Sequence, residues 1–386
     1  MTPPAPATTR ILGLDYARAL AIFGMVGAHL GNAPEFVLTE PSTWDGIIHG
    51  NSSILFGVLA GVSIALMTGG SRIPQPAELP ALRLRLVGRG AVIFVIGLFL
   101  ELLGTSVAII LTFYGMLYLL VLPVLRWRPA ALVALAVGIG VIGPPVVALL
   151  FDANYLIYAP GFTFLFGGMY PLTTWLPLLL VGLALGRTDF AKTLTAITMF
   201  VFGFGIWLLG QGLGMLTMPW IAQVEFETGG ATGTVVRALA DITPHGGGTL
   251  ELVTSGAFAF AVLGFCLLIP RAAATVLRPL SAVGAMPLTT YTGHLIALAL
   301  LWPGGELPFS NLVWGITVVI MLVACPIWLH FVRRGPLEEL TAQVGLLTAG
   351  QPSALRRVPA VAGPAARETT NGAAPSEKDA PPHVSE

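Results

Sequence analysis

Long apolar runs recur along almost the whole chain and constrain its fold more than any other feature. A helix needs about 20 residues to cross the hydrocarbon core of a bilayer. Because unpaired backbone groups in lipid are costly, such runs are expected to form helices and not open strands. The sequence therefore predicts an all-α, polytopic membrane bundle of about ten transmembrane helices. These are 11–30, 47–67, 86–103, 106–125, 129–151, 172–186, 194–218, 250–269, 280–302 and 311–332.

The composition favours the same class of protein. Apolar residues make up 55% of the 386 residues and charged residues only 10%, whereas soluble domains have about 25% charged residues. The formal net charge is zero and there is no dense basic run, so nucleic acid is not an expected partner. Cys266 and Cys325 lie in apolar runs without metal-ligand spacing, so no metal site is expected. The excess of arginine over lysine is typical of a GC-rich, bacterial genome.

The distribution of positive charge predicts the orientation of the bundle. All but Arg18 and Arg237 of the 19 Lys and Arg residues precede the first run, lie in or beside alternate connections, or belong to the C-terminal tail. Both termini are therefore expected in the cytoplasm, with the chain in the plasma membrane. The opposite connections carry mainly acids, namely Glu35, Glu40, Asp45, Asp152, Glu225, Glu227, Asp241 and Glu306.

Three parts are expected along the chain. Residues 1–9 form a short cytoplasmic segment, and residues 10–340 form the transmembrane domain. The stretch 349–386 is rich in Pro, Ala, Ser and Glu and predicts a disordered cytoplasmic tail, because it has too few apolar residues to bury a core. The longest outer connection, about 219–248, is polar and glycine-rich and is expected to pack over the helix ends.

The first run carries the densest set of ionisable residues, namely Asp15, Arg18 and His29. Charged groups inside a membrane are costly, so each is a functional candidate. Asp15 and Arg18 are three residues apart and can pair on a helix. Arg18 and His29 are eleven residues apart, which puts them on nearly one face, about 16 Å from each other. A purely structural alternative is that the Asp–Arg pair closes one helix end while His29 reaches the interface.

Two further histidines are expected on the same outer side as His29. His49 precedes the apolar part of the second run, and His245 lies in the glycine-rich stretch 243–251, which ends at Glu251. An imidazole can move a proton near neutral pH, and free backbone N–H groups beside it can hold an oxyanion. Glu251 is a candidate for orienting the His245 ring. Both histidines could equally be ordinary polar loop residues.

A stripe of polar side chains extends into the apolar run 280–302. Thr290 and His294 are four residues apart on one helix face, and Tyr291 is on the adjacent face. Such a stripe must face the bundle interior or a wet cavity, although hydrogen bonding between helices would also explain it. Tyr114 and Tyr118 are interpreted as packing aromatics.

Several well-known catalytic motifs are missing from the sequence. It contains no P-loop, no dinucleotide-binding Gly-x-Gly-x-x-Gly unit, no His-Glu-x-x-His and no Gly-x-Ser-x-Gly elbow. Nucleotide hydrolysis, zinc proteolysis and α/β-hydrolase chemistry are therefore not expected.

Five short segments, in order from residue 10 to about 340, resemble the transmembrane acyltransferases. The resemblance is to bacterial relatives of heparan-alpha-glucosaminide N-acetyltransferase and, in the first helix, to acyltransferase family 3. The segments are Arg10-Ile-Leu-Gly-Leu-Asp15-Tyr-Ala-Arg18-Ala-Leu-Ala, Trp44-Asp-Gly, Leu55-Phe-Gly-Val-Leu-Ala-Gly61, Leu288-Thr-Thr-Tyr291 and Arg334-Gly-Pro-Leu-Glu338.

The resemblance implies roles for particular residues. In acyltransferase family 3 an arginine and a histidine eleven residues later act as a pair, which corresponds to Arg18 and His29, although Ala19 replaces the usual glycine. The glucosaminide enzymes place their active histidine just before the tryptophan that resembles Trp44. This chain has Glu-Pro-Ser-Thr at 40–43, so the resemblance implies that His29 or His245 is the catalytic base.

The implied activity is transfer of an acyl group, most simply acetyl, from cytosolic acyl-CoA to a hydroxyl or amine of an envelope sugar or glycolipid outside. Arg18 would attract the donor, and the base would take the acceptor's proton. Acetyl-CoA is the expected co-substrate, with no metal. The substrate-binding candidates are Arg18, Asp15, Tyr291, His294 and His49.

Two other functions stay open from the residues alone. A membrane transporter or flippase could use Asp15, Arg18 and His294 as a relay, and a non-catalytic scaffold could use the same residues only to join helices. The sequence also leaves open whether the chain forms a homodimer in the bilayer.

Overall fold

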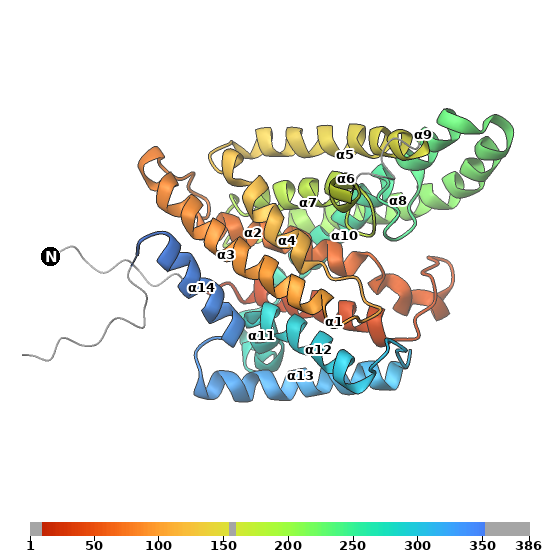
Figure 1. Ribbon diagram of the computed structural model, residues 1–386. Coiled ribbons are helices and arrows are strands. Elements are labelled where there is room, and N and C mark those ends of the chain that lie inside the picture. Colours follow the sequence, from red (N-terminus) through yellow and green to blue (C-terminus); the bar gives the residue numbers. More distant parts are fainter. Residues whose placement is uncertain (1–9, 154–159, 352–386) are drawn as a thin grey trace, which may run out of the picture.

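The computed structural model describes residues 10–153 and 160–351, and every regular element in these residues is helical. Most of the long helices lie side by side along one direction, with α5 at one edge and α13 at the opposite edge (Figure 1). The expectations for residues 1–9 and for nearly all of the tail 349–386 lie outside the described residues.

Most of the α-helices in the described residues overlap the predicted runs, but those at 160–166, 230–240 and 336–348 lie outside them. The first seven are α1 (Leu12–Leu30), α2 (Asn51–Met67), α3 (Leu79–Glu101), α4 (Leu111–Leu120), α5 (Pro129–Asp152), α6 (Pro160–Phe166) and α7 (Leu172–Leu185). The others are α8 (Thr193–Thr228), α9 (Gly230–Ala240), α10 (Thr249–Leu268), α11 (Arg278–Ala285), α12 (Pro287–Leu301), α13 (Asn311–Phe331) and α14 (Pro336–Thr348). A 3₁₀ helix, η1 (Pro41–Ile48), leads into α2.

Each of the ten predicted runs contains helix, which confirms the fold class, but the runs are not ten equal spans. Among the described residues, five helical segments are long and apolar enough to cross a membrane alone, and a sixth results if α11 and α12 count as one span bent by 83°. The helices α4 and α7 are shorter apolar helices. The helices α1 and α3 have sufficient length but carry charged residues.

The run 280–302 was expected to be one helix, and the structure corrects this. The helix breaks at Met286, between α11 and α12, where Pro287 supplies no backbone N–H. Gly284 of α11 lies so close to the backbone of Asp15 in α1 that an added Cβ would be 1.7 Å from the Asp15 carbonyl oxygen. This contact fixes α11 against α1, and α12 continues from the break in a different direction.

The connection 219–248, which was expected to pack over the helix ends, is mostly helical. The helix α8 continues to Thr228, and α9 follows after Gly229 and packs on α5 and α8. Arg237 of α9, one of the two basic residues outside the charge pattern, pairs with Glu225 and lies 3.5 Å from Asp241. Its position is explained by this local ion-pair cluster.

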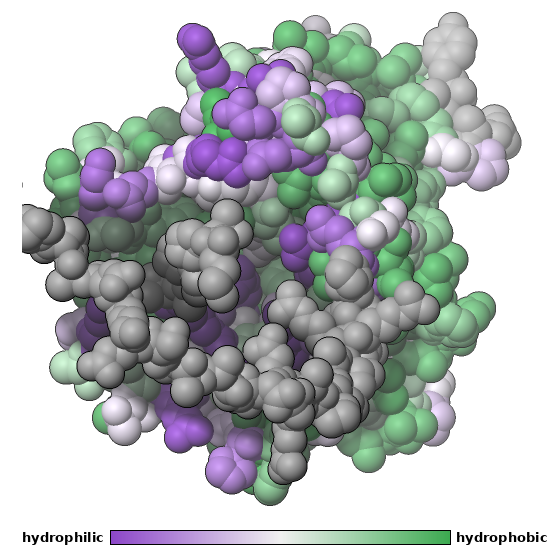
Figure 2. Space-filling model, turned by 90° about the vertical axis from the view of Figure 1, so that its left-hand side faces the viewer, coloured by the Kyte–Doolittle hydropathy of each residue, from purple (hydrophilic) through white to green (hydrophobic). Residues whose placement is uncertain are grey.

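The basic connections gather at one end of the bundle, called here the basic end. Arg10 lines one cavity together with Arg271 and a second cavity together with Arg334, so these three arginines lie at the same end. The buried Arg187 donates hydrogen bonds to backbone oxygens of Gly70 and Arg72, at 2.9 and 3.1 Å. Figure 2 shows hydrophilic patches on this face among hydrophobic surroundings.

The opposite end of the bundle, the histidine end, holds His29 in the last turn of α1, His49 before α2 and His245 before α10. These segments are in close contact. A Cβ added to Gly50 would lie 3.2 Å from Pro244, and a Cβ added to Gly24 of α1 would touch Ser52 of α2. The predicted grouping of the three histidines is therefore present.

Candidate active site

The predicted pair of Asp15 and Arg18 is present near the basic end of α1. Asp15 is buried, and its Oδ1 accepts a hydrogen bond from Nη1 of Arg18 at 3.0 Å. Its Oδ2 accepts a second from Nε of Arg10 at 2.5 Å. Nη2 of Arg18 donates to the hydroxyl of Ser63 on α2 at 2.9 Å. Two cations thus face one carboxylate, which leaves the cluster net positive.

A cavity of about 530 Å³ opens beside this cluster, and we call it the arginine cavity. Its wall carries six arginines against two carboxylates, those of Asp15 and Glu338. The Nε atoms of Arg85 and Arg89 are buried and have no hydrogen-bond partner in the described structure. Planar guanidinium groups with free N–H donors suit phosphate. The six arginines are Arg10, Arg18, Arg85, Arg89, Arg333 and Arg334.

The sequence reasoning used Arg85 and Arg89 only for orientation and so missed this cavity. Their spacing of four residues on one helix was the available signal, because residues at i and i+4 share a face. The partners from 333–342 could not have been found by spacing, since they come from the opposite end of the chain.

Glu338 belongs to the same wall and fixes the start of α12. Its Oε1 accepts hydrogen bonds from the backbone N–H groups of Leu288 and Thr289, at 2.7 and 3.1 Å. Its Oε2 accepts the Thr289 hydroxyl at 2.5 Å. A carboxylate at a helix N-terminus satisfies free donors and complements the helix dipole. The two C-terminal segments of the family resemblance, 288–291 and 334–338, are therefore in direct contact.

His29 of α1 and His294 of α12 are in direct contact. Nδ1 of His29 lies 3.1 Å from Nε2 of His294, and the rings stack at 15° with centroids 5.4 Å apart. His294 is buried on α12, and its Nδ1 lies 3.4 Å from the carbonyl oxygen of Thr290.

These contacts select one pattern of ring protons. A carbonyl oxygen accepts only, so Nδ1 of His294 carries the proton and its Nε2 is the acceptor. His29 then donates from Nδ1, which leaves the lone pair on its Nε2 free. The two contacts thus fix the tautomer and the orientation of the His29 ring.

Aromatic rings separate this histidine pair from the arginine cavity. Tyr291 meets His294 edge-on at a centroid distance of 5.2 Å and stacks on Phe56 at 6.3 Å. Phe56 and Tyr114 both line the arginine cavity, and their centroids are 5.4 Å apart. The Tyr114 hydroxyl is buried without a partner in the described residues. Tyr114 was interpreted as a packing residue, but it presents a polar group beside the cavity.

His245 occupies a loop that Glu251 holds in place. The buried Glu251 accepts the backbone N–H of His245 at 2.6 Å and that of Gly247 at 2.7 Å. His245 has a φ of 63°, a strained value for a residue with a side chain. The expectation that Glu251 orients the imidazole is wrong, because it binds the backbone. For the same reason the expected free N–H groups of this loop are occupied and unavailable to an oxyanion.

The His245 ring lies near other polar and aromatic groups of the histidine end. Burial lowers its pKa from the usual 6.5, the nearby His49 lowers it further, and a hydrogen bond with the Met169 backbone opposes both. The ring also meets Tyr170 edge-on at a centroid distance of 6.3 Å. His49 itself is 3.1 Å from the Ala33 carbonyl oxygen through Nε2.

The structure thus divides the predicted residues into three groups. Asp15 and Arg18 lie at the arginine cavity, while His29, His294 and Tyr291 form one contact cluster. The third group is His245 with His49, which lies close enough to His245 to lower its pKa. Within the described residues, no group of three His, Cys, Asp or Glu side chains is arranged to hold a metal ion.

Comparison with known proteins matches the two parts of this site to two family models. The family model described as heparan-alpha-glucosaminide N-acetyltransferase, catalytic, matches residues 10–211, and a protein family of unknown function, DUF418, matches residues 228–346. No curated protein and no solved structure matches the chain. The first match covers Arg18, His29 and His49, and the second covers His245, Tyr291 and His294. Because the first match spans just over half of the 386 residues, the chain belongs to the heparan-alpha-glucosaminide N-acetyltransferase catalytic family of membrane acetyltransferases.

Proposed function

We propose that this protein transfers an acyl group, most simply acetyl, from acyl-CoA to a hydroxyl or amine of an envelope sugar or glycolipid. The donor binds in the arginine cavity and the acceptor binds at the histidine end. The observation that carries this proposal is the continuous series from six arginines, through Phe56 and Tyr291, to the paired histidines. The positive-inside rule puts the basic end in the cytoplasm, where acyl-CoA is available.

Coenzyme A carries phosphates at one end and a thioester at the other, which matches the polarity of the arginine cavity. We assign the phosphates to Arg85 and Arg89, whose Nε–H groups are unpartnered in the described structure. Arg18, held by Asp15 and Ser63, lines the same cavity as these two arginines and Phe56. The pantetheine arm then runs past Tyr114, whose free hydroxyl can donate to an amide or thioester carbonyl.

The proposed reaction uses His29 as the base. The acceptor oxygen or nitrogen attacks the thioester carbonyl while Nε2 of His29 removes its proton. The C–S bond then breaks, and the leaving thiolate takes that proton from His29 to release coenzyme A. His294 accepts the Nδ1–H of His29, a hydrogen bond that becomes stronger when His29 carries charge. General-base catalysis of this kind contributes about 10²–10⁴-fold. His245 is the alternative base, and its lowered pKa keeps it neutral at pH 7.

The remaining candidates are assigned to substrate binding. Asp15 holds Arg18 in place, Tyr291 packs between Phe56 of the cavity wall and His294, and His49 lies beside His245 at the acceptor side. The bilayer surrounds the whole arrangement.

Acetyl-CoA turnover in nanodiscs tests the proposal directly. Purified wild-type protein should release free coenzyme A from acetyl-CoA when membrane lipids from the source cells are added, and mass spectrometry should detect an acetylated lipid or glycan. Replacement of His29 by alanine should stop both. Movement of a glycolipid across the membrane without release of coenzyme A would contradict the enzyme and support the transporter.

A further inference from the structure

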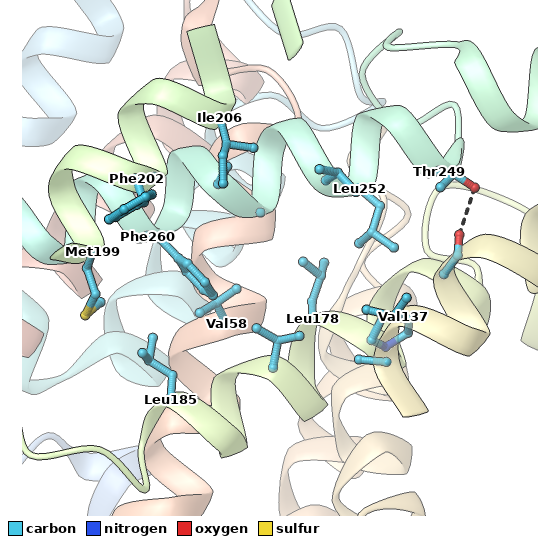
Figure 3. A pocket seen from close by; sticks show the side chains of 18 of the residues that line it. Val58, Val137, Leu178, Leu185, Met199, Phe202, Ile206, Thr249, Leu252 and Phe260 are labelled. Atoms are coloured by element: carbon cyan, nitrogen blue, oxygen red, sulfur yellow. Dashed lines mark hydrogen bonds between the residues drawn. The ribbon is translucent and has the colours of Figure 1, made fainter. Parts of the chain in front are cut away.

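A second cavity, of about 490 Å³, lies between α5, α7, α8 and α10 and does not take part in the mechanism above. Figure 3 shows its wall of aliphatic and aromatic side chains, among them Leu178, Leu252 and Phe260. The only polar side chains in the wall are two threonines, Thr198 and Thr249. The Thr249 hydroxyl already donates to the Gly140 carbonyl oxygen at 2.8 Å. We call this cavity the apolar slot.

The apolar slot is accessible from the outside of the bundle. Val137 of α5 and Phe202 of α8 are part of its wall, yet 56% and 65% of their surfaces are exposed. Both helices are candidate membrane spans, and only 22% and 28% of their most apolar windows are buried inside the protein. The medium around this opening is therefore hydrocarbon, and the molecules that can enter from the side are lipid chains.

The apolar slot also leads to the proposed acceptor side. On α10 its wall extends from Thr249 to Phe260, which is eleven residues or about 16 Å along the helix. Thr249 is the first residue of α10 and follows the loop of His245 that Glu251 holds. The helix α2 borders both cavities. Its Val58 lines the apolar slot, and its Phe56, on the other side of the helix, lines the arginine cavity. One helix therefore separates the two cavities.

We infer that the apolar slot binds the hydrocarbon chain of a lipid-linked acceptor and thereby places the acceptor's sugar beside His245. This inference rests on the proposed function and names its acceptor class. A chain that moves from the bilayer into the slot exchanges one apolar environment for another, so the slot gives position with little affinity. Contacts of the sugar at the histidine end must then supply the selectivity.

A substitution that fills the slot tests this inference. Gly256 of α10 lines the slot, and a Cβ there would meet only Leu178, at an ordinary 3.7 Å. Gly256→Leu therefore extends a side chain into the slot with little backbone strain. Gly205→Leu is the matched control, because Gly205 lies on exposed α8 surface with nothing within 4 Å of its Cβ. Both changes replace glycine by leucine within a long membrane helix.

The probe is dodecyl glucoside with a diazirine at the end of its chain, photolysed with the full-length protein in nanodiscs. We expect labelled peptides from α7, α8 and α10 in the wild type, at least a fivefold loss of this labelling in Gly256→Leu, and no loss in Gly205→Leu. Equal labelling in all three proteins would overturn the inference. Displacement of the label by palmitoyl-CoA but not by unlabelled dodecyl glucoside would assign the slot to a donor chain and overturn it too.

Coenzyme A release separates failure of this inference from failure of the proposed function. The labelling needs no catalysis, so it reports on the slot even if acetyl-CoA is never consumed. If the wild type turns over acetyl-CoA with a lipid acceptor, Gly256→Leu should lower that turnover at least fivefold while background hydrolysis of acetyl-CoA stays unchanged. Unchanged turnover with the lipid acceptor would count against the slot and leave the proposed reaction standing.

Discussion

Nδ1 of His29 and Nε2 of His294 lie 3.1 Å apart although 265 residues separate them in the chain. The contact joins the two family matches, because His29 belongs to residues 10–211 and His294 to residues 228–346. The candidate site is therefore shared between the acetyltransferase part and the part whose family has no known function. Both parts are needed to orient the proposed base.

Replacement of His29 by alanine should lower acyl transfer by about 10²–10⁴-fold, since a general base contributes that much. Membrane abundance should stay near the wild-type level, because His29 lies at the half-buried last turn of α1. Coenzyme A release and immunoblotting measure the two effects. His330→Ala, at the far end of α13, is the matched control. Full activity in the double variant His29→Ala, His245→Ala would exclude the proposed mechanism.

Removal of Arg85 or Arg89 should weaken donor binding. Hydrogen bonds to charged groups contribute about 1.5–3 kcal/mol, so each change to alanine should raise KM for acetyl-CoA about 10- to 100-fold, with a smaller effect on kcat. Arg83→Ala is the control on the same helix, because Arg83 is exposed and donates to the Leu122 carbonyl oxygen outside the cavity. Equal KM values in all three variants would place the donor elsewhere.

Stability should decline in acid because the pKa of His245 is lowered from 6.5. The folded protein keeps this ring neutral to a lower pH than the unfolded chain does. Stability from this group is therefore complete above pH 6.5 and declines as the pH falls through the lowered pKa. Thermal unfolding between pH 5 and pH 8 measures this, and His245→Gln should flatten the dependence. An unchanged pH profile in that variant would contradict the assignment.

Loss of the Glu338 carboxylate should disturb the start of α12. Capping contacts contribute about 0.5–2 kcal/mol, so Glu338→Ala should lower the unfolding temperature and reduce acyl transfer by displacing His294. Glu339→Ala serves as the control, because the Glu339 side chain is 40% exposed and its ion pair with Arg334 lies at the surface. Such surface pairs contribute about 0–1 kcal/mol. Similar losses in both variants would show that Glu338 has no special role.

The positions of the helices followed from the sequence because the length and apolarity of a membrane helix are local properties. The Asp15–Arg18 pair followed for the same reason, since it depends only on spacing within one helix. The run 280–302 was misjudged because its break depends on a distant carboxylate, that of Glu338, and on the tight contact of Gly284 with α1.

The contacts across the site required the fold itself. The pattern of residues suggested His29 and His294 as separate candidates, but their contact depends on how α1 and α12 pack. The arginine cavity likewise combines α1 and α3 with residues 333–342. Glu251 was expected to touch the ring of His245, whereas the left-handed turn at His245 directs its backbone N–H to the carboxylate instead.

The cap on α12 has a consequence for how the protein is made. Glu338 follows the amide that it binds on Leu288 by 50 residues, so the first turn of α12 has unsatisfied N–H groups until α14 has been synthesised. The histidine on that helix cannot take its final position beside His29 before then. In a ribosome-bound chain the described apolar helices up to α13 would therefore enter the membrane first, and α14 would then complete the proposed site.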